Sequence, residues 1–127
     1  MNRRILTIDD DPAVRDAFVF ALSDVGYEVE TASDGAEGVE LARRTAPALI
    51  FLDLRMPGMD GVETLRRLHE VCPRVPVYIV TAFRPDYLDE LAQAARDGLR
   101  FGIASKPLTS DQIRTITHSV LEGPEVM

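Results

Sequence analysis

The chain has 127 residues, of which 46% are hydrophobic and 28% are charged, and its formal net charge is −7. This length and composition predict one ordinary globular domain, while the negative charge argues against direct nucleic acid binding, which needs clustered Lys and Arg. The apolar runs are too short to cross a bilayer, and the single cysteine, Cys72, excludes an internal disulfide. We therefore expect a cytoplasmic protein that does not enter the membrane.

Strand-like and helix-like segments alternate from one end of the chain to the other. The strands are short apolar runs, and the helices are recognised by apolar residues that recur every three or four positions. The expected strands cover about residues 5–8, 27–31, 49–52, 77–80 and 100–104. The expected helices begin at Asp11-Pro12, Asp34, Asp60, Pro85 and Thr109, and all but Pro85 supply an N-capping side chain.

The fourth helix and the fifth strand have less regular patterns than the others. In the helix, four apolar residues are expected to face the core: Leu88, Leu91, Ala92 and Ala95. In the strand, Gly102 stands at the centre, where glycine weakens a strand unless another group approaches closely.

Five β–α units with continuously apolar central strands predict a parallel sheet that helices cover on both faces. Because crossovers between parallel strands are right-handed, few strand orders remain. We expect an α/β, flavodoxin-like doubly wound (βα)5 fold with the strand order 2-1-3-4-5. Residues 1–127 would form one domain, with a structured core at about 4–121 and a tail or the start of a linker at 122–127.

Polar residues follow four of the five predicted strands. Asp9 and Asp10 follow the first strand, Asp53 the third, Thr81 the fourth and Lys106 the fifth. Because parallel strands bring their carboxyl ends to the same edge, where ligands bind in open α/β sheets, these side chains should converge. In the predicted order the first and third strands are neighbours.

The carboxylates of Asp9, Asp10 and Asp53 would repel one another and raise one another's pKa unless a cation lay among them. Their hard oxygen ligands suit a divalent ion, and a partly hydrated Mg²⁺ fits best. The alternative is that acids at a strand end are solvated or cap a helix, and for Asp11 we favour the cap because Pro12 follows it.

Taken singly, Thr81 is typical of a strand end and Lys106 of a solvated surface. Taken together, a carboxylate nucleophile, a cation, a hydroxyl and a lysine at one edge can handle a phosphoryl group. This set, with the motif Asp53-Leu54-Arg55-Met56-Pro57-Gly58-Met59-Asp60-Gly61 and the pairs Asp9-Asp10, Thr81-Ala82 and Lys106-Pro107, resembles the receiver domain of two-component response regulators. The resemblance covers almost the whole chain.

The resemblance implies a role for each site residue. Asp53 would be the phosphoacceptor, Asp10 would bind Mg²⁺ directly and Asp9 through water, and the backbone carbonyl of Arg55 would be a further metal ligand. Thr81 and Lys106 would contact the phosphoryl oxygens, and the peptide bond between Lys106 and its following proline would be cis.

The resemblance also implies a signalling switch rather than an enzyme that turns over a substrate. The protein would catalyse its own phosphorylation and slow autodephosphorylation, taking the phosphoryl group from a sensor histidine kinase or a phosphotransfer protein. Phosphorylation would change its conformation and control a downstream effector or an output domain. A homodimer would form through the face of the fourth helix, fifth strand and fifth helix.

The sequence departs from the family pattern near the fifth strand. An aromatic residue usually stands three positions before the lysine, but here this position is Ile103, and Phe101 lies two residues earlier. Either Phe101 takes over the aromatic switch, or both side chains only pack. The segment between Thr81 and Lys106 is also a few residues longer than usual, so the loop 83–85 and the fourth helix should differ in shape.

Two rival functions remain open at this point. A degenerate receiver could act as a constitutive protein-interaction scaffold, which Ile103 favours and the retention of all five polar residues disfavours. A phosphohydrolase of the haloacid-dehalogenase type could use Asp9-x-Asp11 as its nucleophile motif. That alternative leaves Asp53 unexplained, and the sequence has no acidic pair after Lys106 to hold the metal.

Overall fold

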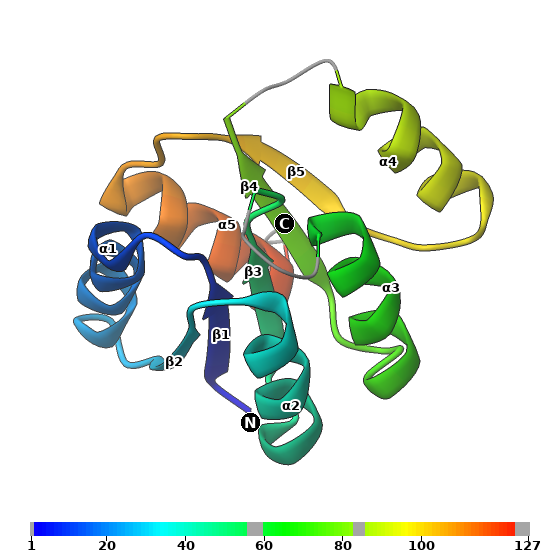
Figure 1. Ribbon diagram of the computed structural model, residues 1–127. Helices are drawn as coiled ribbons and strands as arrows, with labels where there is room; N and C mark the ends of the chain where they lie inside the picture. The colour runs from blue at the N-terminus through cyan, green and yellow to red at the C-terminus, as the bar shows by residue number, and fades with distance from the viewer. Residues whose placement is uncertain (1, 56–59, 83–85, 124–127) are drawn as a thin grey trace.

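The computed structural model describes residues 2–55, 60–82 and 86–123, and within these ranges five strands and five helices alternate (Figure 1). The strands are β1 (Arg4–Ile8), β2 (Glu28–Ala32), β3 (Leu49–Leu52), β4 (Val77–Thr81) and β5 (Gly102–Ser105). The helices are α1 (Pro12–Ser23), α2 (Gly35–Thr45), α3 (Gly61–Val71), α4 (Asp86–Arg96) and α5 (Ser110–Glu122). The turn expected at 56–59, the loop 83–85 with the helix start at Pro85, and the tail from 124 lie outside the described residues.

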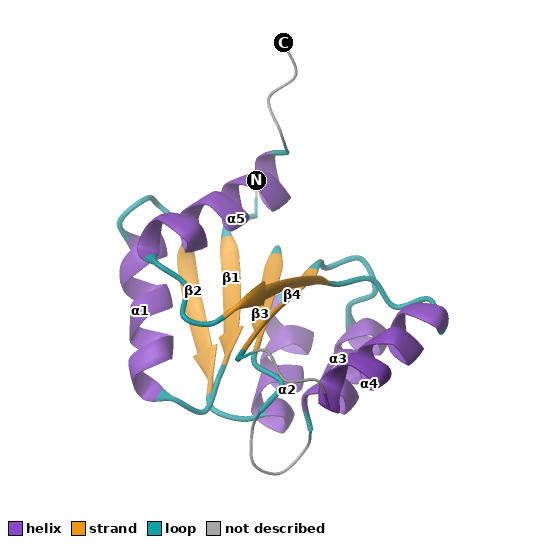
Figure 2. Ribbon diagram, turned by 90° about the horizontal axis from the view of Figure 1, so that it is seen from above, coloured by secondary structure: helices purple, strands orange, loops and turns teal. Residues whose placement is uncertain are grey.

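The strands form one parallel sheet in the order β2-β1-β3-β4-β5. Helices α1 and α5 cover one face, and α2, α3 and α4 cover the other (Figures 1 and 2). The predicted α/β, flavodoxin-like doubly wound fold is therefore confirmed. None of the helices in the described ranges combines the length and the hydropathy that a membrane span requires.

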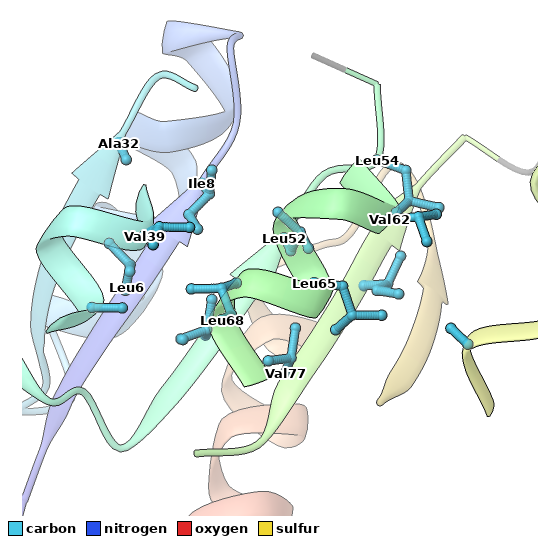
Figure 3. Packing of buried hydrophobic residues seen from close by; sticks show 14 of the residues in the cluster. Leu6, Ile8, Ala32, Val39, Leu52, Leu54, Val62, Leu65, Leu68 and Val77 are labelled. Atoms are coloured by element: carbon cyan, nitrogen blue, oxygen red, sulfur yellow. The ribbon is translucent and has the colours of Figure 1, made fainter. Parts of the chain in front are cut away.

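The core has two layers because side chains alternate along each strand. In β3 all four residues are buried: Leu49 and Phe51 pack with α1 and α5, whereas Ile50 and Leu52 pack on the other face. Figure 3 shows this second layer, to which α3 contributes Leu65 among others. The sheet is thus fixed on both faces, and only the ends of its strands are open to a ligand.

Local capping side chains define where most helices begin. In four helices the side chain of the residue before the first turn accepts a backbone N–H, and these caps are Asp11, Asp34, Asp60 and Thr109. All four were expected from the sequence. Asp11 accepts from the Ala13 N–H at 2.9 Å, which supports its interpretation as a cap. Since these helices run back from the carboxyl ends of the strands, the caps surround that edge of the sheet.

The buried face of α4 differs from the prediction. Leu91 and Ala94 are buried, whereas Leu88, Ala92 and Ala95 are exposed. The apolar residues of this helix span an arc of about 160° at 100° per residue, and the two buried residues lie toward one end of it, so the pattern does not show which part of the arc will meet the core. Prediction of the helix was right, and prediction of its rotation was wrong.

The glycine in the centre of β5 has a clear structural cause. Gly102 is paired with Tyr78 of β4, and a Cβ at this glycine would lie 2.5 Å from the Tyr78 ring. The ring of Tyr78 therefore lies across the strand, in space that any other residue would occupy. Strand β5 begins at this glycine, two residues later than expected from the sequence.

Candidate functional site

The backbone of the sheet brings the predicted site residues to one edge. The N–H of Asp53 donates to the carbonyl of Ile8 at 2.9 Å, and the N–H of Lys106 donates to the carbonyl of Thr81 at 2.9 Å. These residues therefore continue the hydrogen-bond ladder just beyond the strands. Asp9 is fixed in the same way on the other side, where its N–H donates to the carbonyl of Ala32 at 3.0 Å.

Three carboxylates meet at this edge. Asp9, Asp10 and Asp53 each offer an oxygen, and these oxygens lie within 4.8 Å of one another. Asp9 and Asp53 are only 3% and 4% exposed, whereas Asp10 faces solvent. Two buried acids beside an exposed one form a compact cluster of hard oxygen donors with an open side, and this donor set fits a divalent cation such as Mg²⁺.

Lys106 neutralises part of this negative charge. Its Nζ lies 2.8 Å from Oδ2 of Asp9 and 3.3 Å from Oδ2 of Asp53. Burial alone would lower the pKa of the Lys106 ammonium, but the hydrogen bond to Asp9 and the charges of both carboxylates outweigh burial and raise that pKa. The lysine therefore stays charged and links residues that follow three different strands.

For Asp53, the influences that favour the neutral form of the side chain outweigh those that favour the charged form. Burial and the neighbouring charge of Asp9 raise the pKa of the Asp53 carboxyl above its usual value, against the hydrogen bond from the Arg55 N–H and the charge of Lys106. The Arg55 N–H donates to Oδ1 at 3.2 Å. Oδ2 faces Lys106, so both oxygens have partners while the site lacks enough positive charge to balance its acids.

One residue at this edge was not expected from the sequence. The guanidinium of Arg15 in α1 donates from Nη1 to the backbone carbonyl of Asp9 at 2.8 Å. It holds the β1–α1 connection in place, together with the Asp11 N–H, which donates to Oδ1 of Asp9 at 2.9 Å. The sequence offers one indication of this contact. Arg15 lies near the N-terminal, positive end of α1, where the helix dipole disfavours a cation unless an acceptor outside the helix binds it.

Thr81 and a shallow hollow complete the described part of the site. Thr81 is buried, and its Oγ1 donates to the carbonyl of Ala82 at 3.2 Å. The hollow measures about 240 Å³ and is lined by Asp10, Asp11, Asp53, Arg55, Ala82 and Lys106. The Lys106–Pro107 peptide bond is cis, as the resemblance implied. The site is thus an open acidic depression with one lysine in it.

The two residues near the missing aromatic lie in different surroundings. Ile103 is 47% exposed on β5, and Phe101 packs against the core on the face covered by α2, α3 and α4. Phe101 also precedes the first residue of β5. A spacing of two residues would put both side chains on one face of an ideal strand, but Phe101 lies outside β5, so this alternation does not apply to it.

Comparison with known proteins assigns the family. A profile described as the response regulator receiver domain matches residues 5–118. The chain therefore belongs to the receiver domains of response regulators, the proteins of two-component signalling. Receiver domains typically do not turn over a substrate. The acidic triad is consistent with the metal site typical of receivers.

Curated relatives and solved structures agree with this assignment. The response regulator MprA of Mycobacterium leprae is 43% identical over 79 residues, which cover 62% of this chain and 35% of that protein. The chain thus spans little more than a third of the length of the relatives it matches. The CheY-like receiver of Methanospirillum hungatei JF-1 superimposes with a TM-score of 0.83 at 28% identity and 97% coverage of both chains. Vibrio cholerae CheY4 gives 0.83 at 26% identity, covering 95% of this chain and 100% of that one.

Proposed function

We propose that this protein is a phosphorylation-activated switch in which Asp53 accepts a phosphoryl group. The donor is the phosphohistidine of a sensor histidine kinase or a phosphotransfer protein in the cytoplasm, a compartment that suits the lone cysteine. The observation that carries the proposal is the placement of Asp53 beside Asp9, Asp10 and Lys106 at the open edge of the sheet. Residues 1–127 form one receiver domain in this proposal, with the core at about 4–121 and a tail or linker at 122–127.

The proposed reaction needs little more than charge balance and position. An oxygen of the Asp53 carboxylate forms a bond to phosphorus, the bond from phosphorus to the histidine nitrogen breaks, and that nitrogen keeps the electron pair. Asp9, Asp10, Asp53 and the Arg55 carbonyl would hold Mg²⁺, whose charge offsets that of the phosphoryl oxygens. The protein acts on itself and slowly loses the phosphoryl group by hydrolysis, without turning over a separate substrate.

The acyl phosphate would change the contacts of two neighbouring side chains. Asp53 would go from about −1 to about −2 in charge, and Lys106 and the Thr81 hydroxyl can donate charge-assisted hydrogen bonds to the added oxygens. The Thr81 hydroxyl would leave the Ala82 carbonyl to do so, which moves the chain after β4. A shift from mostly inactive to mostly active needs roughly 3–5.5 kcal/mol, within reach of several such contacts.

The output of the switch is a downstream effector protein or an output domain, and the face of α4, β5 and α5 is the proposed surface for a homodimer. Ile103 supports the use of this face, because a large apolar side chain there is 47% exposed. Nothing in the proposal requires this domain to contact nucleic acid or a membrane itself.

A phosphorylation assay tests the proposal. The protein is incubated with Mg²⁺ and acetyl phosphate, and intact mass is followed over time. The wild-type protein should gain one phosphoryl group, and Asp53→Asn should gain none. Asp34→Asn is the matched control, because asparagine also caps helices and Asp34 caps α2 without lining the hollow. Modification of Asp53→Asn to the wild-type extent would place the phosphoryl group elsewhere and refute the proposal.

The second candidate is a receiver that serves as a constitutive scaffold, and Ile103 in place of the usual aromatic favours it. The two functions differ in the same assay, because a scaffold gains no phosphoryl group even with excess donor. The hydrolase alternative loses its support, since Asp11 caps α1 and the chain belongs to a family whose members typically do not turn over a substrate.

A further inference from the structure

A second hollow opens at the opposite edge of the sheet from the carboxylates. It measures about 650 Å³, a size typical of small-molecule sites. Val77, the first residue of β4, forms part of its wall, whereas the last residue, Thr81, belongs to the phosphorylation site. At about 3.3 Å per residue, the two sites are separated by about 13 Å of strand. The hollow therefore lies outside the site already described.

Basic side chains line this hollow from three segments. His69 comes from α3, Arg74 from the connection between α3 and β4, and Arg100 from the connection between α4 and β5 (Figure 1). Among the described residues that line it there is no carboxylate. In a chain with a net charge of −7, this is an unusual local excess of positive charge.

Arginines on α2 and α3 outside the hollow are paired with acids. Arg43 and Arg67 each form an ion pair with a glutamate on their own helix, and Arg66 pairs with Asp97 at 2.8 Å. By contrast, neither Arg74 nor Arg100 forms an ion pair or a side-chain hydrogen bond with any residue in the described ranges. The described protein thus leaves the charge of both arginines in the hollow unbalanced, as it also does for Arg55 at the carboxyl edge of the sheet.

The rest of the wall is apolar and firmly held. Leu65 and Val77 are buried members of the core, and Val75 packs against the same cluster. Their side chains are fixed by the packing of α3 on the sheet, so this part of the wall is preformed. The hollow thus combines a rigid apolar side with two guanidinium groups, which suit a planar or tetrahedral oxyanion.

We propose that this hollow binds a small organic anion, which carries a phosphate or carboxylate group on an apolar body. Arg74 and Arg100 bind the anionic group, and the imidazole of His69 adds a hydrogen bond. The apolar body packs against Leu65, Val75 and Val77.

Three probes separate the two halves of this site: phenyl phosphate, inorganic phosphate and phenol. Each is titrated into the wild-type protein without Mg²⁺ while the backbone amide NMR signals are recorded. Phenyl phosphate should shift the amides of Val75, Gly98 and Arg100 in a saturable way, inorganic phosphate should bind there more weakly, and phenol should not bind. Shifts confined to Asp10, Asp53 and Ala82 would mean that anions only reach Lys106, and would overturn the proposal, as would no shift at all.

Substitution of the arginines tests which groups hold the anion. Arg74→Gln and Arg100→Gln should each weaken phenyl phosphate binding roughly tenfold, the value of one charge-assisted hydrogen bond. Arg67→Gln is the matched control, since Arg67 is an exposed arginine of α3 paired with Glu63, and its binding should equal wild type. Equal binding by all three variants would refute the site. Phosphorylation of each variant by acetyl phosphate, measured separately, should proceed as in wild type and shows that it is folded.

Discussion

The Nζ atom of Lys106 lies 2.8 Å from Oδ2 of Asp9, so the residue that follows β5 forms an ion pair with the residue that follows β1. The two strands are not neighbours, because β3 and β4 lie between them in the sheet. The lysine reaches across the carboxyl edge past Asp53, and it also contacts that carboxylate at 3.3 Å. Among the described residues, Lys106 is therefore the cation that forms ion pairs with both buried carboxylates.

Replacement of this lysine should destabilise the protein. Lys106→Met leaves the buried carboxylates of Asp9 and Asp53 without their cation, and we expect a loss of about 2 kcal/mol in the free energy of unfolding at pH 7 without Mg²⁺. Urea denaturation measures it. Arg114→Met is the control, because its partner Asp111 is highly exposed and such pairs contribute little. Equal losses in the two variants would show that the Lys106 contacts have no special role.

Neutralisation of Asp53 should have the opposite effect. Because its pKa is raised in the folded protein, this carboxyl favours folding below its unfolded pKa and opposes folding once the pH rises through its folded pKa. Asp53→Asn should therefore be more stable than wild type at pH 7 without Mg²⁺, by about 1 kcal/mol. The advantage should shrink as the pH falls toward 3.

Mg²⁺ should reverse that advantage, because it stabilises the folded wild type in proportion to its binding and an asparagine is a poorer ligand. Thermal unfolding with and without Mg²⁺ measures both effects, and Asp34→Asn, at a helix cap outside the hollow, should follow wild type. A lower stability of Asp53→Asn at pH 7 without Mg²⁺ would contradict the raised pKa.

A buried hydroxyl in β1 offers a test of packing. Among the described side chains, Oγ1 of Thr7 is the buried polar atom without a hydrogen-bond partner. Thr7→Val keeps the shape and removes the unsatisfied group, so the free energy of unfolding should rise by about 1 kcal/mol. Thr7→Ser keeps the hydroxyl and loses a methyl group, so it should be less stable than wild type. A destabilised Thr7→Val protein would show that the hydroxyl has a partner, such as a buried water.

Two helical glycines should differ in their tolerance of a methyl group. A Cβ on Gly61 would lie 2.3 Å from the backbone Cα of Leu54, which directly follows Asp53, whereas a Cβ on Gly38 would meet the side chain of Ile8. A side chain can move more easily than backbone. Gly61→Ala should therefore cost about 2 kcal/mol or more in a urea unfolding experiment, and Gly38→Ala should cost less. The reverse order would mean that the segment after Asp53 adapts readily.

The predictions from sequence succeeded where the signal is local or repeated. Caps such as Asp60 depend on a few adjacent residues, and the apolar run of β3 is buried on both faces. The convergence of Asp9 and Asp53 followed from strand order alone, because the ends of adjacent parallel strands must meet. The strand order thus predicts which site residues lie close together without any knowledge of side-chain geometry.

The features that the sequence did not reveal depend on tertiary contacts. The contact of Arg15 with the Asp9 carbonyl joins a helix to a loop. The geometry of this contact depends on the orientation of α1 relative to the sheet. The rotation of α4 is set by the packing of Leu91 and Ala94 on the core. The apolar arc of this helix is wider than the buried stripe, so the sequence does not indicate which part of it is buried. The contact between the Tyr78 ring and Gly102 could not be predicted from the sequence either, because it depends on the register between β4 and β5.

The amides that complete the strand pairing belong to residues of the candidate site. Asp9, Asp53 and Lys106 each donate the last backbone hydrogen bond of a strand pairing. A change in the contacts of any of these side chains therefore acts on a residue whose own backbone is hydrogen-bonded to the neighbouring strand. Hydrogen exchange at these three positions therefore reports how stably the strand ends are held at the edge of the candidate site.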